Sequence, residues 1–373
     1  MRKLSLRGSS LKELPRRMRE LVNLEHLDLS KSSLMELGTE IGALSNLVTL
    51  SLSEAGALRS IPKTIGRLQK LRELNLWGTS IASLPDELFE LPGLAILNIG
   101  ATRKLTLRAG TLSRLRGLDS LNLYGFAATA IPGDIFSMQR LSKLELGDAC
   151  LKTIPNELGD LSNLESLALD GGSFRALPAT FTKLRKLTAL DLSRCSKLAL
   201  ARAFRVLAGL PRLRELSLSG SHPMQQWFAR IPPGLSRLTA LRKLDLQGNQ
   251  LTELPADVFE IDQLEELDLS QNVLGSLPRE VGRLQRLKKL SLRFNRHNQY
   301  IKGSSNIDLS QLFNQARNLK SLRELDLRWM SLESIPKRVA ALPALRVLKL
   351  GHEFPEEARA AVESSLRGVS VRY

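Results

Sequence analysis

The sequence predicts an α/β solenoid, in which one short strand and one short helical turn recur along the chain. Leucines return in a single spaced pattern through nearly all of the 373 residues, and proline-led apolar segments separate the copies. Hydrophobic residues are 43% of the chain and aromatic residues only 5%, so the core has to be large and aliphatic. These three observations favour a repeat architecture over two or three separate domains.

The leucine pattern is L-x-x-L-x-L, and fifteen copies of it follow one another. The copies begin at Met1, Leu24, Leu47, Leu71, Leu94, Leu118, Leu141, Leu164, Leu187, Leu213, Leu241, Leu264, Leu287, Leu322 and Leu345. Steps of 23 or 24 residues separate them, except for 26 after Leu187, 28 after Leu213 and 35 after Leu287. A period of about 20–29 residues with this core is typical of leucine-rich repeats. Each copy predicts a short strand, and the strands together predict a parallel concave sheet.

Between the strands runs a second pattern, L-P-x-x-[I/L/V]-G-x-L. Examples run from Ile61 to Leu68, from Ile154 to Leu161 and from Leu277 to Leu284. Proline ends the extended stretch and opens a short helix or 3-10 turn, which we expect on the convex side. Because neither face of one repeat can be buried alone, about 15 repeats must stack into a right-handed horseshoe.

The ninth position of the repeat is asparagine at Asn249, Asn272 and Asn295. An amide there can satisfy backbone groups along the stack. Residues such as Ala55 and Met330 cannot do so with their side chains. We therefore expect the polar ladder to be best formed in repeats 11 to 13.

The pattern assigns residues 1–350 to the leucine-rich-repeat solenoid, with insertions near 221–229 and 296–318. The second insertion holds an expected helix over 309–317, with Asp308 or Ser310 near its cap. Insertions in repeat proteins often lie on a binding face, although neutral loop growth would give the same sequence. Residues 351–373 predict a capping helix, between Pro355 and Gly368, and a last edge strand.

The beginning of the chain lacks a comparable cap, because Met1 already falls on a strand position. Terminal repeats need a polar outer face. We expect residues upstream of Met1, and a natural start with a frayed first repeat is the alternative.

No catalytic signature is present in the sequence. GxxxxGK[ST], GxGxxG, HExxH and GxSxG motifs are all missing, and the histidines His26, His222, His297 and His352 fall in distant repeats. Cys150 and Cys195 lie two repeats apart, about 9–10 Å, which is too far for a disulfide. The sequence therefore predicts no enzyme, no catalytic residue, no metal and no cofactor.

Nothing in the sequence indicates a cleaved signal peptide or a membrane span. The first residues lack an apolar run of about 7–15 residues, and no stretch approaches about 18 apolar residues. We expect a soluble protein, with a monomer favoured, that is cytoplasmic or is secreted into a host cell without a cleaved signal peptide.

The candidate binding residues lie on the concave face, where alternate strand residues point outward. One outward column is acidic and includes Asp245 and Asp268. Phe294 and Trp329 occupy the same place in adjacent repeats, with Arg293, Arg328 and Lys289 nearby. Aromatic residues and arginine are typical interface anchors. The alternatives are a self-paired charged surface and a Phe294 that packs under the insertion following it.

A second, looser aromatic pair consists of Trp77 and Tyr124, two repeats apart. Gly100 lies between them and leaves room for the rings. This pair is the other candidate anchor on the concave face.

The strong positive charge allows a different partner. The formal net charge is +16, and eight Lys or Arg but only one acid lie between Arg279 and Lys302. A basic surface with aromatics can bind nucleic acid. The acidic column argues against a phosphate track along the inner arc, so an anionic-surface or nucleic-acid binder is an alternative to a protein-binding scaffold.

The unit L-x-x-L-P-x-x-I-G-x-L-x-x-L-x-x-L-x-L-x-x-N-x-L resembles the 23-residue intracellular repeat of Ras-group leucine-rich-repeat proteins. It is also similar to the repeat domains of type III secreted effectors of plant-pathogenic bacteria; residues 254–274 are a close copy. Arg (36) outnumbers Lys (18), as expected for a GC-rich bacterial genome. The resemblance implies a virulence-type effector, or its recognition domain, that binds a host protein. The alternative is the substrate-recognition module of an enzyme, such as a bacterial ubiquitin ligase, whose catalytic part is absent.

Overall fold

The computed structural model describes the chain except for residues 127–130, 149–150, 221–227, 296–306 and 331. It divides into two compact units. The first unit contains residues 1–174 and 178–187, and the second contains 175–177 and 188–373. Residues 221–227 of the first expected insertion and 296–306 of the second therefore lie outside the described residues.

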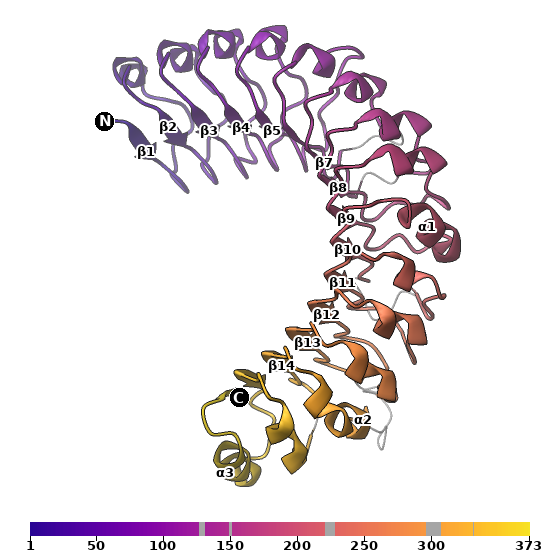
Figure 1. Ribbon diagram of the computed structural model, residues 1–373. Coiled ribbons are helices and arrows are strands. Elements are labelled where there is room, and N and C mark those ends of the chain that lie inside the picture. The colour runs from indigo at the N-terminus through magenta and orange to yellow at the C-terminus, as the bar shows by residue number, and fades with distance from the viewer. Residues whose placement is uncertain (127–130, 149–150, 221–227, 296–306, 331) are drawn as a thin grey trace. The chain divides into compact units, whose positions relative to one another are not determined.

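In each unit, three-residue strands form one layer of the structure (Figure 1). In the first unit they are β1 (Lys3–Ser5), β2 (His26–Asp28), β3 (Thr49–Ser51), β4 (Glu73–Asn75), β5 (Ile96–Asn98), β6 (Ser120–Asn122), β7 (Lys143–Glu145) and β8 (Ser166–Ala168). In the second unit they are β9 (Ala189–Asp191), β10 (Glu215–Ser217), β11 (Lys243–Asp245), β12 (Glu266–Asp268), β13 (Lys289–Ser291), β14 (Glu324–Asp326), β15 (Val347–Lys349) and β16 (Ser370–Arg372). Within each unit, consecutive strands pair in parallel with one constant register.

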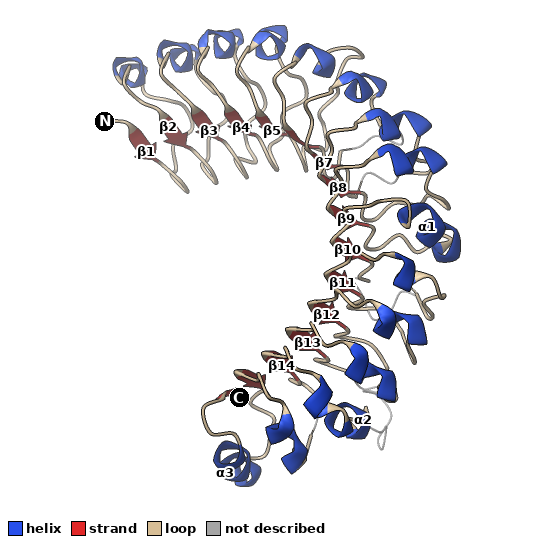
Figure 2. Cartoon of the chain, viewed as in Figure 1, coloured by secondary structure: helices blue, strands red, loops and turns tan. Residues whose placement is uncertain are grey.

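Short 3-10 helices form the opposite layer of each unit and connect one strand to the next (Figure 2). They span Arg16–Glu20, Thr39–Ala43, Lys63–Arg67, Asp86–Glu90, Leu112–Arg114, Gly133–Ser137, Asn156–Asp160 and Ala179–Lys183 in the first unit. In the second unit they span Leu235–Arg237, Ala256–Glu260, Arg279–Arg283, Ala316–Asn318 and Lys337–Ala341. Proline is the N-cap residue of most of them, as at Pro62 and Pro278, because its fixed φ suits the extended residue that precedes the first turn.

Among the described residues, three α-helices depart from this regular series. They are α1 (Leu200–Leu207), α2 (Ser310–Asn314) and α3 (Glu356–Ser365). The helix expected over 309–317 is shorter than predicted, because the α-helix ends at Asn314 and the chain continues as the 3-10 turn that begins at Ala316. The sequence did not predict α1, which occupies the repeat that is lengthened after Leu187.

Leucine fills the core at the positions that the repeat pattern predicts. The middle residue of every strand from β2 to β15 is a buried leucine, and Leu267 is 2% exposed. Since every repeat contributes the same apolar set, neighbouring repeats bury each other's faces. These features confirm the predicted α/β leucine-rich-repeat solenoid.

The asparagine ladder in the second unit is also confirmed. Asn249, Asn272 and Asn295 are at most 3% exposed. The Asn272 amide donates to the carbonyls of Leu246 and Leu269, both at 2.9 Å, and Asn249 and Asn295 bind in the same way. Each amide therefore ties its own turn to the repeat before it.

Candidate partner-binding site

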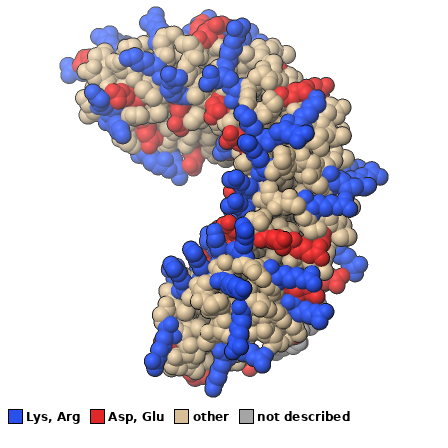
Figure 3. All heavy atoms as spheres, viewed as in Figure 1, with Lys and Arg blue, Asp and Glu red and all other residues tan. Residues whose placement is uncertain are grey.

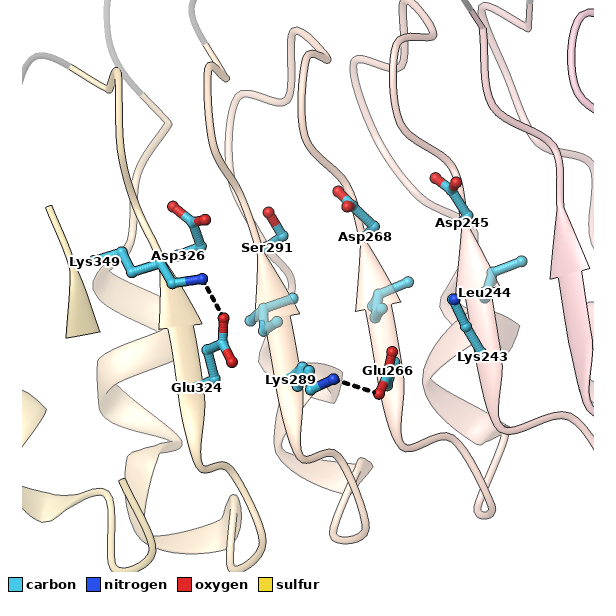
Figure 4. Close-up of a pocket in the computed structure, with 12 residues that line it drawn as sticks. Lys243, Leu244, Asp245, Glu266, Asp268, Lys289, Ser291, Glu324, Asp326 and Lys349 are labelled. Carbon is cyan, nitrogen blue, oxygen red and sulfur yellow. Dashed lines mark hydrogen bonds and ion pairs between the residues drawn. The ribbon is translucent and has the colours of Figure 1, made fainter. Parts of the chain in front are cut away.

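The first residue of each strand in the second unit points out of the sheet and carries a charge in β10 to β14. Lys289 pairs with Glu266 at 2.8 Å, and Glu324 pairs with Lys349, which is the last residue of β15 (Figure 4). The hydrogen bond to Glu266 raises the pKa of Lys289 above its ordinary value. These side chains line a hollow of about 360 Å³ on the exposed face of the sheet.

The third residue of the strand forms the acidic column, and its carboxylates have a structural role. Asp245, Asp268 and Asp326 each accept a hydrogen bond through Oδ1 from the backbone N–H two residues later, at 2.9, 2.8 and 3.2 Å. Such Asx turns end the strand and start the loop that follows. The predicted binding residues Asp245 and Asp268 therefore already use one carboxylate oxygen inside their own repeats.

The position of Asp245 within this column raises its pKa. Burial is the largest cause, and the negative charges of Asp268 and Asp191 act in the same direction. Hydrogen bonds from the Gln247 N–H and the Ser217 hydroxyl oppose the shift without cancelling it. The column is thus a line of like charges held together by the fold.

Three residues after the last residue of most strands, the backbone adopts a left-handed conformation. Glycine occupies this position in several repeats, for example Gly78 and Gly248 with φ of 67° and 68°. In two adjacent repeats it is occupied by Phe294 and Trp329, each with φ of 60°. Six other repeats also place a non-glycine residue there, among them Gln271 with φ of 56°, so the conformation belongs to the repeat. What sets positions 294 and 329 apart is the aromatic side chain that each carries.

The parallel register of β13 and β14 brings Phe294 and Trp329 to neighbouring strand ends, as the sequence analysis expected. The Phe294 N–H donates to the carbonyl of Arg328 at 2.9 Å, and the Trp329 N–H donates to the Glu353 carboxylate. Trp329 is 36% exposed, and its ring meets His352 edge-on with centroids 4.6 Å apart. His352 is thus an additional member of the aromatic patch.

The cations predicted beside the aromatics differ in their surroundings. The Arg328 guanidinium binds both oxygens of Asp326, and Lys289 is held by Glu266. Arg293 is half-buried and has no ion pair with any residue that the structure describes. Of the predicted cations, Arg293 is therefore the one with an uncommitted charge.

The second predicted pair, Trp77 and Tyr124, lies in the first unit, where the rings contact each other with centroids 5.4 Å apart. A Cβ on Gly100 would lie 2.6 Å from Cζ3 of Trp77, so the ring covers this glycine. Ile96, the outward first residue of β5 in the repeat between them, is 40% exposed. The sequence analysis missed Ile96, although an isoleucine at an outward strand position was a readable signal.

The described residues hold no cluster of histidine, cysteine or acidic side chains that could bind a metal ion. Cys195 is buried, and Cys150 lies outside the described residues. Within the described part of the chain, no helix has both the length and the apolar character needed to cross a membrane.

Comparison with protein families gives two matches. Residues 232–368 match a family described as a leucine-rich repeat region, and residues 69–125 match one described as a leucine rich repeat. The chain therefore contains leucine-rich repeats, a fold that generally serves as a scaffold for binding other proteins. No curated protein sequence matches it.

Solved structures share this fold. A leucine-rich-repeat protein of Leptospira interrogans is 26% identical, with a TM-score of 0.66 over 100% of this chain and 96% of that one. An internalin of Listeria monocytogenes is 20% identical, with a TM-score of 0.62 over 88% of this chain and 87% of that one. A plant peptide hormone receptor, solved in complex with RGF2, is 24% identical, with a TM-score of 0.53 over 94% of this chain and 59% of that one.

Proposed function

We propose that this chain is a protein-interaction scaffold that binds a partner protein across the exposed face of its sheet. The observation that carries the proposal is the pair Phe294 and Trp329, two aromatic side chains at the same position of adjacent repeats, of which Trp329 is exposed and Phe294 half-buried. Aromatic side chains beside arginine are the usual anchors of protein interfaces. Arg293 and His352 extend this anchor.

The surrounding surface suits docking without rearrangement. The backbone of each strand is fixed by its two neighbours, and Asp245 and Asp268 fix the turns that follow their strands. A preformed surface loses little conformational entropy when it binds. Trp77 and Tyr124 would act as a separate anchor on the first unit.

The partner in this proposal is a host protein, and the chain is a bacterial effector or its recognition domain. The repeat type and the excess of arginine support this assignment, as does the 26% identity to a bacterial repeat protein along the whole chain. Binding alone would be its activity, with no catalytic step.

Site-specific photo-crosslinking tests the proposal. Lys243→p-benzoylphenylalanine places the crosslinker on the sheet face, and Gln285→p-benzoylphenylalanine places it on the exposed return side as the matched control. Both proteins are irradiated in plant-cell lysate and in bacterial lysate at about 0.15 M salt, near physiological ionic strength. We expect a host protein crosslinked from position 243, and its loss when Phe294→Ala and Trp329→Ala are added.

Crosslinks that form only from position 285 would contradict the use of the sheet face. A partner taken from the bacterial lysate instead would contradict the effector assignment while leaving the scaffold intact. Recovery of nucleic acid alone, released by salt, would replace the proposal with the anionic-surface alternative.

A further inference from the structure

A row of charged residues, all but one of them basic, immediately precedes strands β10 to β15 of the second unit. Its members are Arg214, Arg242, Glu265, Lys288, Arg323 and Arg346. Each backbone N–H donates to the carbonyl of the corresponding residue in the repeat before it, at 2.7 or 2.8 Å. Successive members are therefore one strand spacing apart, about 4.8 Å.

The single acid in this row is already occupied. Glu265 pairs with Lys288 at 2.6 Å and with Arg242 at 3.4 Å. The hydrogen bond from Lys288 is the main reason that the pKa of Glu265 lies below its ordinary value. Glu265 thus has no capacity left for the arginines further along the row.

Arg323 and Arg346 are adjacent, exposed and uncommitted. Neither forms an ion pair or a side-chain hydrogen bond with any residue that the structure describes. The two carboxylates that follow Arg323 in the sequence, Glu324 and Asp326, are bound by Lys349 and Arg328. The two neighbouring guanidinium groups therefore have no counter-charge bound to them among the described residues.

The other ends of these strands carry the opposite charge. Asp245 and Asp268 are the last residues of β11 and β12 and follow Arg242 and Glu265 by three residues, which corresponds to about 10 Å along the chain. Figure 3 shows lysine and arginine side chains gathered over the strands of the second unit, with acidic side chains between them. A polyanion long enough to reach both ends of the strands would be repelled by the aspartates.

We infer that Arg323 and Arg346, flanked by Lys288, bind the carboxylates of an acidic segment of the partner protein. The segment would present its acidic side chains to the basic row and neutral or basic side chains to the aspartate column. Arginine suits this role because its planar guanidinium donates two parallel hydrogen bonds to one carboxylate. The inference rests on the proposed function, since it names the chemistry of one part of the partner.

Fluorescence anisotropy tests this site with the full chain and a labelled peptide of alternating glutamate and serine. The test variant is Arg323→Ala with Arg346→Ala. The matched control is Arg317→Ala with Lys337→Ala, which removes the same charge from exposed return-side residues of neighbouring repeats. At about 0.15 M salt, we expect the test variant to bind roughly tenfold more weakly than wild type, and the control to change less than about twofold.

Further probes separate the sources of negative charge. A single-stranded oligonucleotide of equal charge should bind more weakly than the peptide, and inorganic phosphate should compete only weakly. Equal losses in both double variants would show that net charge alone attracts the peptide, which overturns the site. Tighter binding of the oligonucleotide, or no peptide binding to wild type, would also overturn it. Because this assay does not use the aromatic patch, it can fail while crosslinking from position 243 still succeeds.

Discussion

The Arg328 guanidinium lies over the buried Asp326 carboxylate and binds both of its oxygens. Nε donates to Oδ1 at 2.9 Å, and Nη2 donates to Oδ2 at 2.6 Å. Asp326 is 5% exposed, whereas the Arg328 side chain remains 35% exposed. This hydrogen bond is the main reason that the pKa of Arg328 lies above its ordinary value. One end of the predicted patch is therefore an internal ion pair.

Arg328→Ala should destabilise the fold, because it leaves the Asp326 carboxylate with only its bond from the backbone N–H of residue 328. We expect a loss of about 2 kcal/mol in the free energy of unfolding, measured by urea denaturation. Arg328→Lys should recover part of it, since an ammonium cannot match the two-oxygen geometry. An unfolding midpoint equal to that of wild type for Arg328→Ala would show that water replaces the guanidinium.

Asp245→Asn should stabilise the protein at neutral pH. The folded state raises the pKa of Asp245, so the carboxyl favours folding while protonated and loses that contribution as the pH rises through the folded pKa. The amide keeps the turn, as Asn75, Asn98 and Asn122 do at the same place. We expect a gain of about 0.5 kcal/mol at pH 7 that shrinks as the pH falls through the raised folded pKa of Asp245 and is lost below the unfolded value of about 3.9. A less stable variant at pH 7 would contradict the role of repulsion in the acidic column.

The repeat pattern predicted the core residues correctly, because their positions follow from the spacing of the leucines alone. Leu267 is buried and Asn272 bridges two repeats, as a single copy of the unit indicates. The functional face depends on lateral neighbours that the spacing does not show. Lys288 and Arg323 look alike in sequence, yet only Lys288 finds an acidic neighbour, Glu265, in the adjacent repeat. The Asx turn at Asp268 could not be predicted either, because the hydrogen bond from the Ser270 N–H depends on the folded geometry of the turn.

Trp329→Gly should give a more stable protein than Trp329→Ala. Position 329 has φ of 60°, where glycine is free of the steric cost that any Cβ carries. We expect a difference of about 1 kcal/mol in urea denaturation, opposite in sign to the usual effect of glycine. Exposed Val22, whose φ is not positive, is the control, and Val22→Gly should be less stable there than Val22→Ala. If Trp329→Gly is less stable than Trp329→Ala, as expected at position 22, then Trp329 is not held in the left-handed region.

Gly100→Ala should displace the Trp77 ring. The new Cβ would lie 2.6 Å from Cζ3 of Trp77 and 2.7 Å from Oδ1 of Asn122. We expect a loss of about 1–3 kcal/mol in stability, with a changed near-ultraviolet circular dichroism signal from the Trp77–Tyr124 contact. Gly275→Ala, where a Cβ meets nothing within 4 Å, should have little effect. The cost of Gly100→Ala should also fall in a Trp77→Ala background, and an unchanged cost there would assign the strain to the backbone instead.

The variants Asn272→Thr and Asn272→Ala measure how much the asparagine ladder contributes to the free energy of unfolding. The Asn272 amide donates to Leu246 and Leu269 carbonyls and accepts from the Leu251 N–H at 3.2 Å. A hydroxyl at this position reaches only the carbonyl of its own turn, as Thr79 does with Leu76 at 2.9 Å. We therefore expect a loss of about 3 kcal/mol for alanine and roughly half of that for threonine, because buried backbone groups lose their partners stepwise. Equal losses for both variants would show that the bond within the turn contributes nothing and that the link between repeats carries the whole effect.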